Sequence, residues 1–68
     1  MKPGKAITDT EEGLVVFEMV DANGHVIGYQ LFDGGSPYGA TSQTPEAPVS
    51  AWRQIVESRR QRSSFTLR

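Results

Sequence analysis

The 68-residue sequence contains no cysteine, a single histidine and no apolar run long enough to cross a membrane. The absence of cysteine excludes disulfides, thiolate metal sites and cysteine nucleophiles. One histidine leaves only carboxylates as further metal ligands, so we expect no metal centre and no other cofactor. With no bridge framework and no apolar N-terminal segment, a cytoplasmic location and no membrane partner are expected.

Neither sign of charge dominates the whole chain, which holds seven basic and eight acidic side chains. Residues 1–50 carry two basic and seven acidic groups, whereas residues 51–68 carry five and one. Apolar residues make up 37% of the chain and charged residues 22%, which is typical of a folding sequence. We therefore predict a folded acidic body followed by a basic C-terminal segment.

Two β-strands are predicted in the first half of the chain. Residues 14–20 and 25–32 are rich in β-branched and aromatic side chains. Between them, residues 21–24 (DANG) are typical of a type I turn with a bulge, because Gly24 can take a left-handed conformation. The register that makes one face of this hairpin wholly apolar pairs Val15 with Leu31, Phe17 with Tyr29 and Met19 with Ile27.

The second half of the chain is expected to add a third strand and one helix. Residues 38–41 follow the turn at residues 33–35 and can extend the hairpin. The run Thr44-Pro45-Glu46 is typical of a helix start, but Pro48 disfavours helical geometry at the residue before it. The helix is therefore predicted from Pro48 or Val49 to Arg62, with Trp52 lying on the sheet face formed by Phe17 and Tyr29.

These elements predict a small α+β domain over residues 13–62. An antiparallel β-hairpin or three-stranded sheet, ββ(β)α, would pack one C-terminal amphipathic helix on one face. Residues 1–12 are interpreted as a flexible N-terminal arm, of which residues 6–8 could pair at a sheet edge. Residues 63–68 are interpreted as a basic tail, of which residues 65–67 could add an edge strand.

No constellation typical of catalysis is present in the sequence. His25 follows the hairpin turn directly and is interpreted as an exposed turn residue. Residues 21–24 place glycine fourth, whereas a calcium loop needs it sixth. The glycine-rich residues 33–39 lack the Lys-Ser/Thr pair of a phosphate loop. We therefore predict a protein that is not an enzyme.

Surplus apolar strand surface points to a protein partner. Below roughly 70–80 residues one core seldom contributes more than about 3–5 kcal/mol, and the hairpin face away from the helix is too apolar for a solvated sheet. We predict a protein-interaction or regulatory module, completed by a second copy in a homo-oligomer such as a dimer, or by another protein. The candidate partner contacts are Val16, Val20, Val26, Phe32 and Tyr38.

A nucleic-acid-binding regulator is the alternative function. Several arginines near one helix end could neutralise phosphates and give salt-dependent binding. Cations at a helix C-terminus also stabilise the helix itself by about 0.3–1 kcal/mol each, and intermolecular pairing with the acidic half of another molecule is a third account. The candidate phosphate contacts are Arg53, Arg59, Arg60 and Arg62.

Residues 15–59 also resemble the layout of HicB-type antitoxins. The resemblance lies in a strand pair, a turn-rich loop and the run Thr44-Pro45-Glu46-Ala47 before an amphipathic helix. Residues 33–37 (DGGSP) stand where that family has Pro-Asp-Leu-Pro-Gly, and Pro48 interrupts the helix pattern. The resemblance implies a sheet followed by a helix, and no functional residue is carried over.

Overall fold

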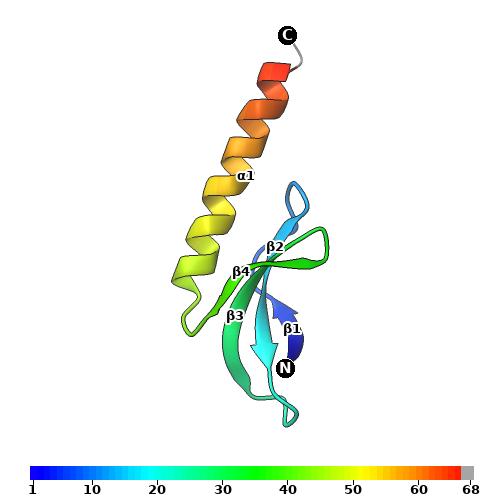
Figure 1. The fold of residues 1–68 in the computed structure, drawn as a ribbon, viewed down its shortest axis with the longest axis vertical. Helices are drawn as coiled ribbons and strands as arrows, with labels where there is room; N and C mark the ends of the chain where they lie inside the picture. Colours follow the sequence, from blue (N-terminus) through cyan, green and yellow to red (C-terminus); the bar gives the residue numbers. More distant parts are fainter. Residues whose placement is uncertain (67–68) are drawn as a thin grey trace.

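One α-helix packs against a four-stranded antiparallel sheet in the computed structural model, which describes residues 1–66 and side-chain surroundings through residue 62 (Figure 1). The sheet is a meander in which each strand pairs with its sequence neighbours, in the order β1-β2-β3-β4. The predicted α+β class is confirmed, with one more strand than expected. The elements are β1 (Lys2–Ala6), β2 (Leu14–Val20), β3 (Val26–Asp33), β4 (Ser36–Ser42) and α1 (Glu46–Thr66).

Strand β1 occupies part of the segment that was expected to be a flexible arm. It pairs with β2 at the sheet edge, and all five of its residues are exposed. Beyond it, the Ile7 amide donates to the Val16 carbonyl at 2.9 Å, and the Val16 amide donates to Thr8 Oγ1 at 3.0 Å. Lys, Pro and Gly are poor strand formers, so main-chain pairing rather than side-chain pattern creates this strand.

The predicted register of β2 and β3 is wrong over most of the ladder. Val16 pairs with Leu31 and Met19 pairs with Gly28, one residue away from the expected partners. The turn itself is as predicted: Gly24 has φ 83° and its amide donates to the Asp21 carbonyl at 3.0 Å. The register shift lies between Met19 and Val20, because Ile27 is an extra residue in β3.

This shift places Phe17 and Tyr29 on opposite faces of the sheet. On the face covered by α1, Leu14, Val16, Leu31 and Val56 form the buried core, with Tyr29 and Trp52 packed against it. Trp52 therefore lies on the sheet face that carries Tyr29, as predicted, but not on the face that carries Phe17.

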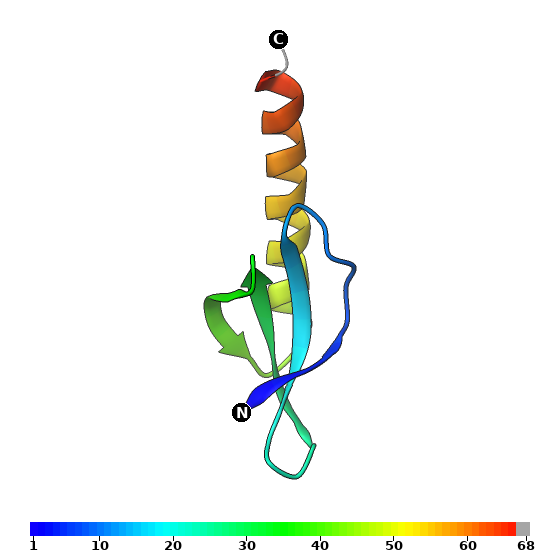
Figure 2. The ribbon, with the colours of Figure 1, turned by 90° about the vertical axis from the view of Figure 1, so that its right-hand side faces the viewer.

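The opposite face is buried by the sheet itself. Val15, Met19 and Phe32 are at most 9% exposed, and the Phe17 and Phe32 rings meet edge to face at 5.3 Å and 84°. All three strand pairs contain a register shift, and such irregularities increase the twist and bending of a sheet. In Figure 2, β1 runs obliquely across β2 on the side away from α1. The second apolar face is thus closed without a partner chain.

Helix α1 begins earlier and ends later than predicted. The Val49 amide donates to the Pro45 carbonyl at 3.0 Å, so Pro48 lies in the first turn, where an N–H would have no helical partner. Residues 63–66, expected in the tail, are helical, which excludes an edge strand there; residues 67–68 lie outside the described part. The C-terminal half of α1 extends beyond the sheet in Figure 1.

Candidate interaction surface

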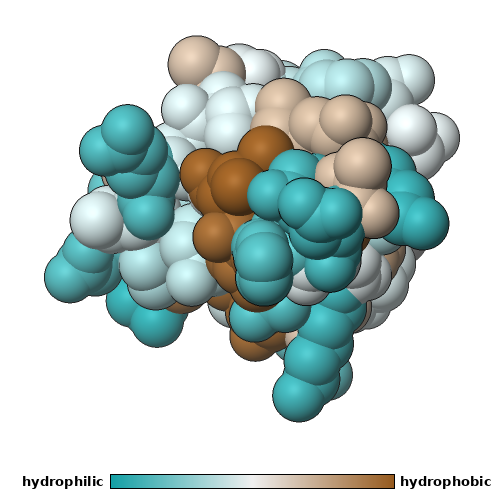
Figure 3. Space-filling model, turned by 90° about the horizontal axis from the view of Figure 1, so that it is seen from below, coloured by the Kyte–Doolittle hydropathy of each residue, from teal (hydrophilic) through white to brown (hydrophobic). Residues whose placement is uncertain are grey.

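Three aliphatic side chains lie at the end of the sheet that α1 does not cover. Val26 is 46% exposed and Ile27 is 48% exposed, while Val20 is partly exposed. Helix α1 starts near the middle of the sheet and runs away from this end (Figure 1). Figure 3, which views the molecule from below, shows apolar side chains gathered between polar ones. We call Val20, Val26 and Ile27 the tip surface.

The β2–β3 turn fixes the geometry of the tip surface. Asp21 Oδ1 accepts the amides of Asn23 and His25, both at 2.9 Å, and the Asp21 amide donates to the His25 carbonyl at 3.0 Å. These bonds hold both strand ends together next to the bulge at Ile27. Because the bulge sets two residues of β3 against Val20, both Val26 and Ile27 reach the surface.

His25 itself has no arrangement that suggests chemistry. Its Nδ1 lies 3.8 Å from Asp21 Oδ2, and its side chain is 78% exposed. Over the described residues, no group of three or more His, Asp or Glu side chains is placed to hold a metal ion. The interpretation of His25 as an exposed turn residue fits this geometry.

The structure separates the five predicted partner contacts. Val20 and Val26 lie on the tip surface, and Tyr38 is 46% exposed on β4. Val16 and Phe32 are wrong as partner contacts, because Val16 is fully buried under α1 and Phe32 is 7% exposed in the core of the opposite face. The register shift explains the error at Val16, because it moves this side chain of β2 to the face under α1. Phe32 lies on the face away from α1, as expected, but the sheet itself buries that face.

Tyr38 lies at the edge of a shallow apolar groove between β4 and the first turns of α1. The groove has a volume of about 200 Å³. Its lining is dominated by small residues and contains no titratable group other than the Tyr38 phenol. The lining residues are Leu31, Tyr38, Gly39, Ala40, Ser42, Ala47, Pro48 and Ala51. Such a groove offers space but no catalytic or charged group.

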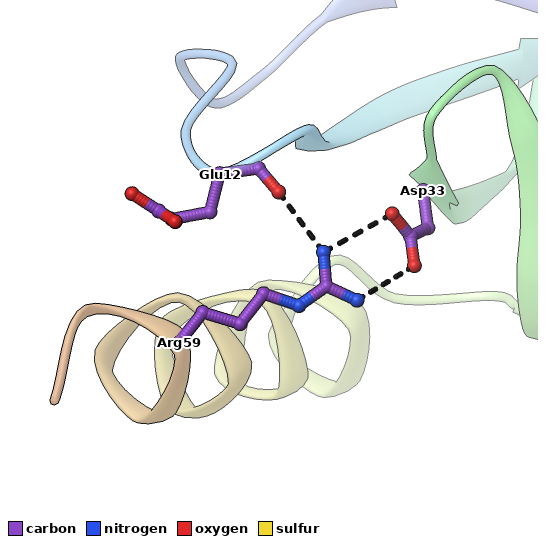
Figure 4. A network of polar contacts seen from close by, with 3 residues as sticks. All are labelled: Glu12, Asp33 and Arg59. Atoms are coloured by element: carbon purple, nitrogen blue, oxygen red, sulfur yellow. Dashed lines mark hydrogen bonds and ion pairs between the residues drawn. The ribbon is translucent and has the colours of Figure 1, made fainter. Parts of the chain in front are cut away.

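Arg59, a candidate phosphate contact, is engaged within the molecule (Figure 4). Its guanidinium donates to both carboxylate oxygens of Asp33, at 3.2 and 2.8 Å, and to the Glu12 carbonyl at 2.9 Å. The hydrogen bond from Arg59 lowers the pKa of Asp33 and raises that of Arg59 itself. Arg59 therefore ties α1 to two turns of the sheet.

Local backbone geometry presents the Glu12 carbonyl to Arg59. Glu12 and Gly13 have φ of 53° and 80°, as in a type I′ turn, and Glu11 and Leu14 exchange main-chain bonds at 2.9 and 2.8 Å. The Gly34 amide donates to the Gly13 carbonyl at 2.9 Å, which joins this turn to the β3–β4 turn. Sequence reasoning missed this turn because it lies where a flexible arm was expected.

The other candidate phosphate contacts differ in their surroundings. Arg60 forms an ion pair with Glu11, so two of the four arginines bind the acidic body of the same chain. Arg53 is exposed on α1 beside Trp52. Arg62 is exposed as well and has an interaction within the molecule. The four side chains do not form one uncommitted basic patch.

Gln30 is a buried polar residue that sequence reasoning treated only as an interruption of an apolar face. It is 4% exposed, and its Nε2 lies 3.1 Å from the carbonyl oxygens of Leu31 and Tyr38 and 3.0 Å from that of Gly39. Its Oε1 accepts from Thr41 Oγ1 at 2.8 Å. The amide therefore bonds the polar groups of β4 at the point where the β3–β4 ladder shifts register. The sequence alone could not predict this role, because it does not show which residues of β4 lie opposite Gln30.

No family model matches the chain, and no curated protein or solved structure matches it either. The resemblance of residues 15–59 to HicB-type antitoxins therefore has no family match behind it. No helix in the described part of the chain is both long and apolar enough to cross a membrane.

Proposed function

We propose that this protein is a non-enzymatic protein-interaction module that binds its partner through the tip surface. The observation that carries the proposal is the exposure of Val26 and Ile27, two consecutive aliphatic residues that are 46% and 48% exposed. Full burial of one such side chain is worth about 1.5–3 kcal/mol, so a partner that covers both gains binding energy. A cytoplasmic location belongs to the same proposal and rests on the cysteine-free composition.

Pairing through the sheet edges is less favourable than contact through side chains. Strand β1 carries Lys2, Pro3 and Lys5 at one edge. Strand β4 carries Pro37 and a left-handed Gly39, and its pairing with β3 is irregular. Lysine, proline and bulges at an edge strand oppose the addition of another strand. The proposal therefore places the contact on side chains.

Nucleic-acid binding has less support than protein binding. A guanidinium that already donates to a carboxylate must lose that bond before it contacts a phosphate. Arg59 and Arg60 are both engaged in this way, with Asp33 and Glu11. The role of these two arginines is better described as fastening α1 to the body.

Site-specific photo-crosslinking in the native host tests the proposed function. A photoreactive phenylalanine analogue at position 27 should give a discrete crosslinked species, because Ile27 is half exposed on the tip surface. The same analogue at position 57, an exposed site on α1, serves as the matched control and should give none. Adding Val26→Ser should reduce the species formed at position 27, since it removes apolar contact area.

Two results would overturn the proposal. One is the absence of any species specific to position 27. The other is an equal yield at positions 27 and 57, which would indicate collision rather than a defined surface.

A further inference from the structure

We infer that the partner at the tip surface is a second copy of this chain, bound face to face about a two-fold axis. This inference rests on the proposed function and adds the identity of the partner. It is carried by the charges on either side of the tip surface, which have opposite signs.

Lys2 and Glu18 flank the tip surface on the same sheet face. Lys2 pairs with Val20, which pairs with Val26, and paired residues in an antiparallel ladder point to the same side. Glu18 precedes Val20 by two positions in β2 and shares that face by strand alternation. The face thus carries an ammonium group on one strand, aliphatic side chains beside it, and a carboxylate further along β2.

Both charged groups are free to act between molecules. Lys2 is exposed and Glu18 is partly exposed, and neither forms an ion pair with any residue over the described chain. A partner whose contact surface carries charges of only one sign would be repelled by either Lys2 or Glu18. A second copy related by a two-fold axis places each Lys2 near the Glu18 of the other molecule, as in a self-complementary interface.

The tip surface is also continuous with an interface that the fold already uses. Along β2, the same face carries Leu14 and Val16, which are buried under α1, then Glu18 and finally Val20. The second copy would therefore cover the part of this face that α1 leaves open. Because only three aliphatic side chains are available, the contact is smaller than the roughly 1,200 Å² of a standard interface, and the dimer is weak and concentration-dependent.

Sedimentation equilibrium on the full chain tests this inference, from about 10 μM to about 1 mM at low salt. The native sequence should shift from monomer to dimer over this range. Ile27→Thr, which keeps a β-branched residue, should weaken the dimer at least about tenfold. Lys2→Glu and Glu18→Lys should each weaken it, whereas the double variant Lys2→Glu/Glu18→Lys should restore it. Glu57→Lys on α1 is the matched charge control and should change nothing.

The outcomes separate this inference from the proposed function. A native chain that stays monomeric at the highest concentration overturns the second copy as partner, and so does a dimer that is insensitive to Ile27→Thr or is not restored by the double charge reversal. If position 27 then still crosslinks to a different protein, the proposed function holds and only this inference fails. Far-ultraviolet circular dichroism of each variant verifies that it is folded.

Discussion

Gln30 illustrates at the residue scale how a polar side chain can organise a sheet. Its amide satisfies carbonyl groups of β3 and β4 where the ladder between these strands is interrupted. A buried polar group of this kind is favourable only while all its partners are in place. The predicted register is the one that makes one face of the hairpin wholly apolar, and it pairs Phe17 with Tyr29. In the structure Phe17 pairs with Gln30, so an apolar residue and a buried amide share this face.

The variant Gln30→Leu should lower the free energy of unfolding by about 1–3 kcal/mol. It removes the amide but leaves the Tyr38 and Gly39 carbonyls and the Thr41 hydroxyl without this partner. Urea unfolding followed by circular dichroism measures the change. The matched control is Gln54→Leu on the exposed side of α1, where the amide meets only Ser50 Oγ at 3.4 Å. Equal effects of the two variants would contradict the organising role of Gln30.

At the scale of elements, α1 is fastened to the sheet along one face. Val56 is 4% exposed in the core with Leu14 and Leu31, and Trp52 Nε1 donates to the Leu14 carbonyl at 2.9 Å. Arg59, one turn beyond Val56, adds the contact to Asp33. Apolar packing by Val56 and the polar contacts of Trp52 and Arg59 therefore lie along the same stripe of the helix, with spacings of three or four residues.

The variant Val56→Ala should destabilise the fold by about 1.5–3 kcal/mol, because it removes two buried methyl groups and leaves a cavity. Glu57→Ala, at the neighbouring exposed position, is the control and should stay within about 0.5 kcal/mol of the native value. Thermal and urea unfolding measure both variants. A small effect of Val56→Ala would show that α1 does not rest on this face.

The elements were easier to predict than their pairing. The side-chain pattern predicted strands over residues 14–20 and 25–32, and β2 and β3 lie there within one residue at each end. It also predicted the turn at Gly24, a strand near residues 38–41 and an amphipathic helix. It missed β1, because that strand depends on main-chain bonds to β2. Of the candidate contacts, Val20 and Val26 could be predicted as surface residues. Ile27 could not, because its exposure depends on the position of the bulge.

At the scale of the whole molecule, the uneven charge along the chain is partly used internally. Arg59 and Arg60 of the basic segment contact Asp33 and Glu11 of the acidic body. The near-neutral net charge of the chain therefore arises from an acidic body and a basic C-terminal segment that contact each other in the folded protein. This arrangement makes the attachment of α1 sensitive to pH.

Stability should fall on acidification through Asp33. Its pKa in the folded protein lies below the ordinary value of 3.8, chiefly because Arg59 donates a hydrogen bond to it. Stabilisation from this group is therefore complete above pH 3.8 and is lost as the pH falls through the lower, folded-state pKa. Urea unfolding midpoints at neutral pH and below about pH 3 measure this loss, and Asp33→Asn should reduce the difference between them.

A double-mutant cycle is the control for this pH effect. At neutral pH, Arg59→Gln and Asp33→Asn should each lower the free energy of unfolding. The double variant should lower it by less than the sum of the two single changes, because both substitutions remove the same contact. Strict additivity, or an Asp33→Asn variant with the native pH dependence, would contradict the assignment.

The order of the elements along the chain has a consequence for synthesis on the ribosome. Every strand pairs with a sequence neighbour, so the whole sheet can assemble once residue 42 has emerged. The core face formed by Leu14, Val16 and Leu31 stays uncovered until the last third of the chain is synthesised, because the residues that cover it, Val56 and Trp52, lie in α1. A nascent chain that is halted before α1 would present this apolar face to solvent and to chaperones.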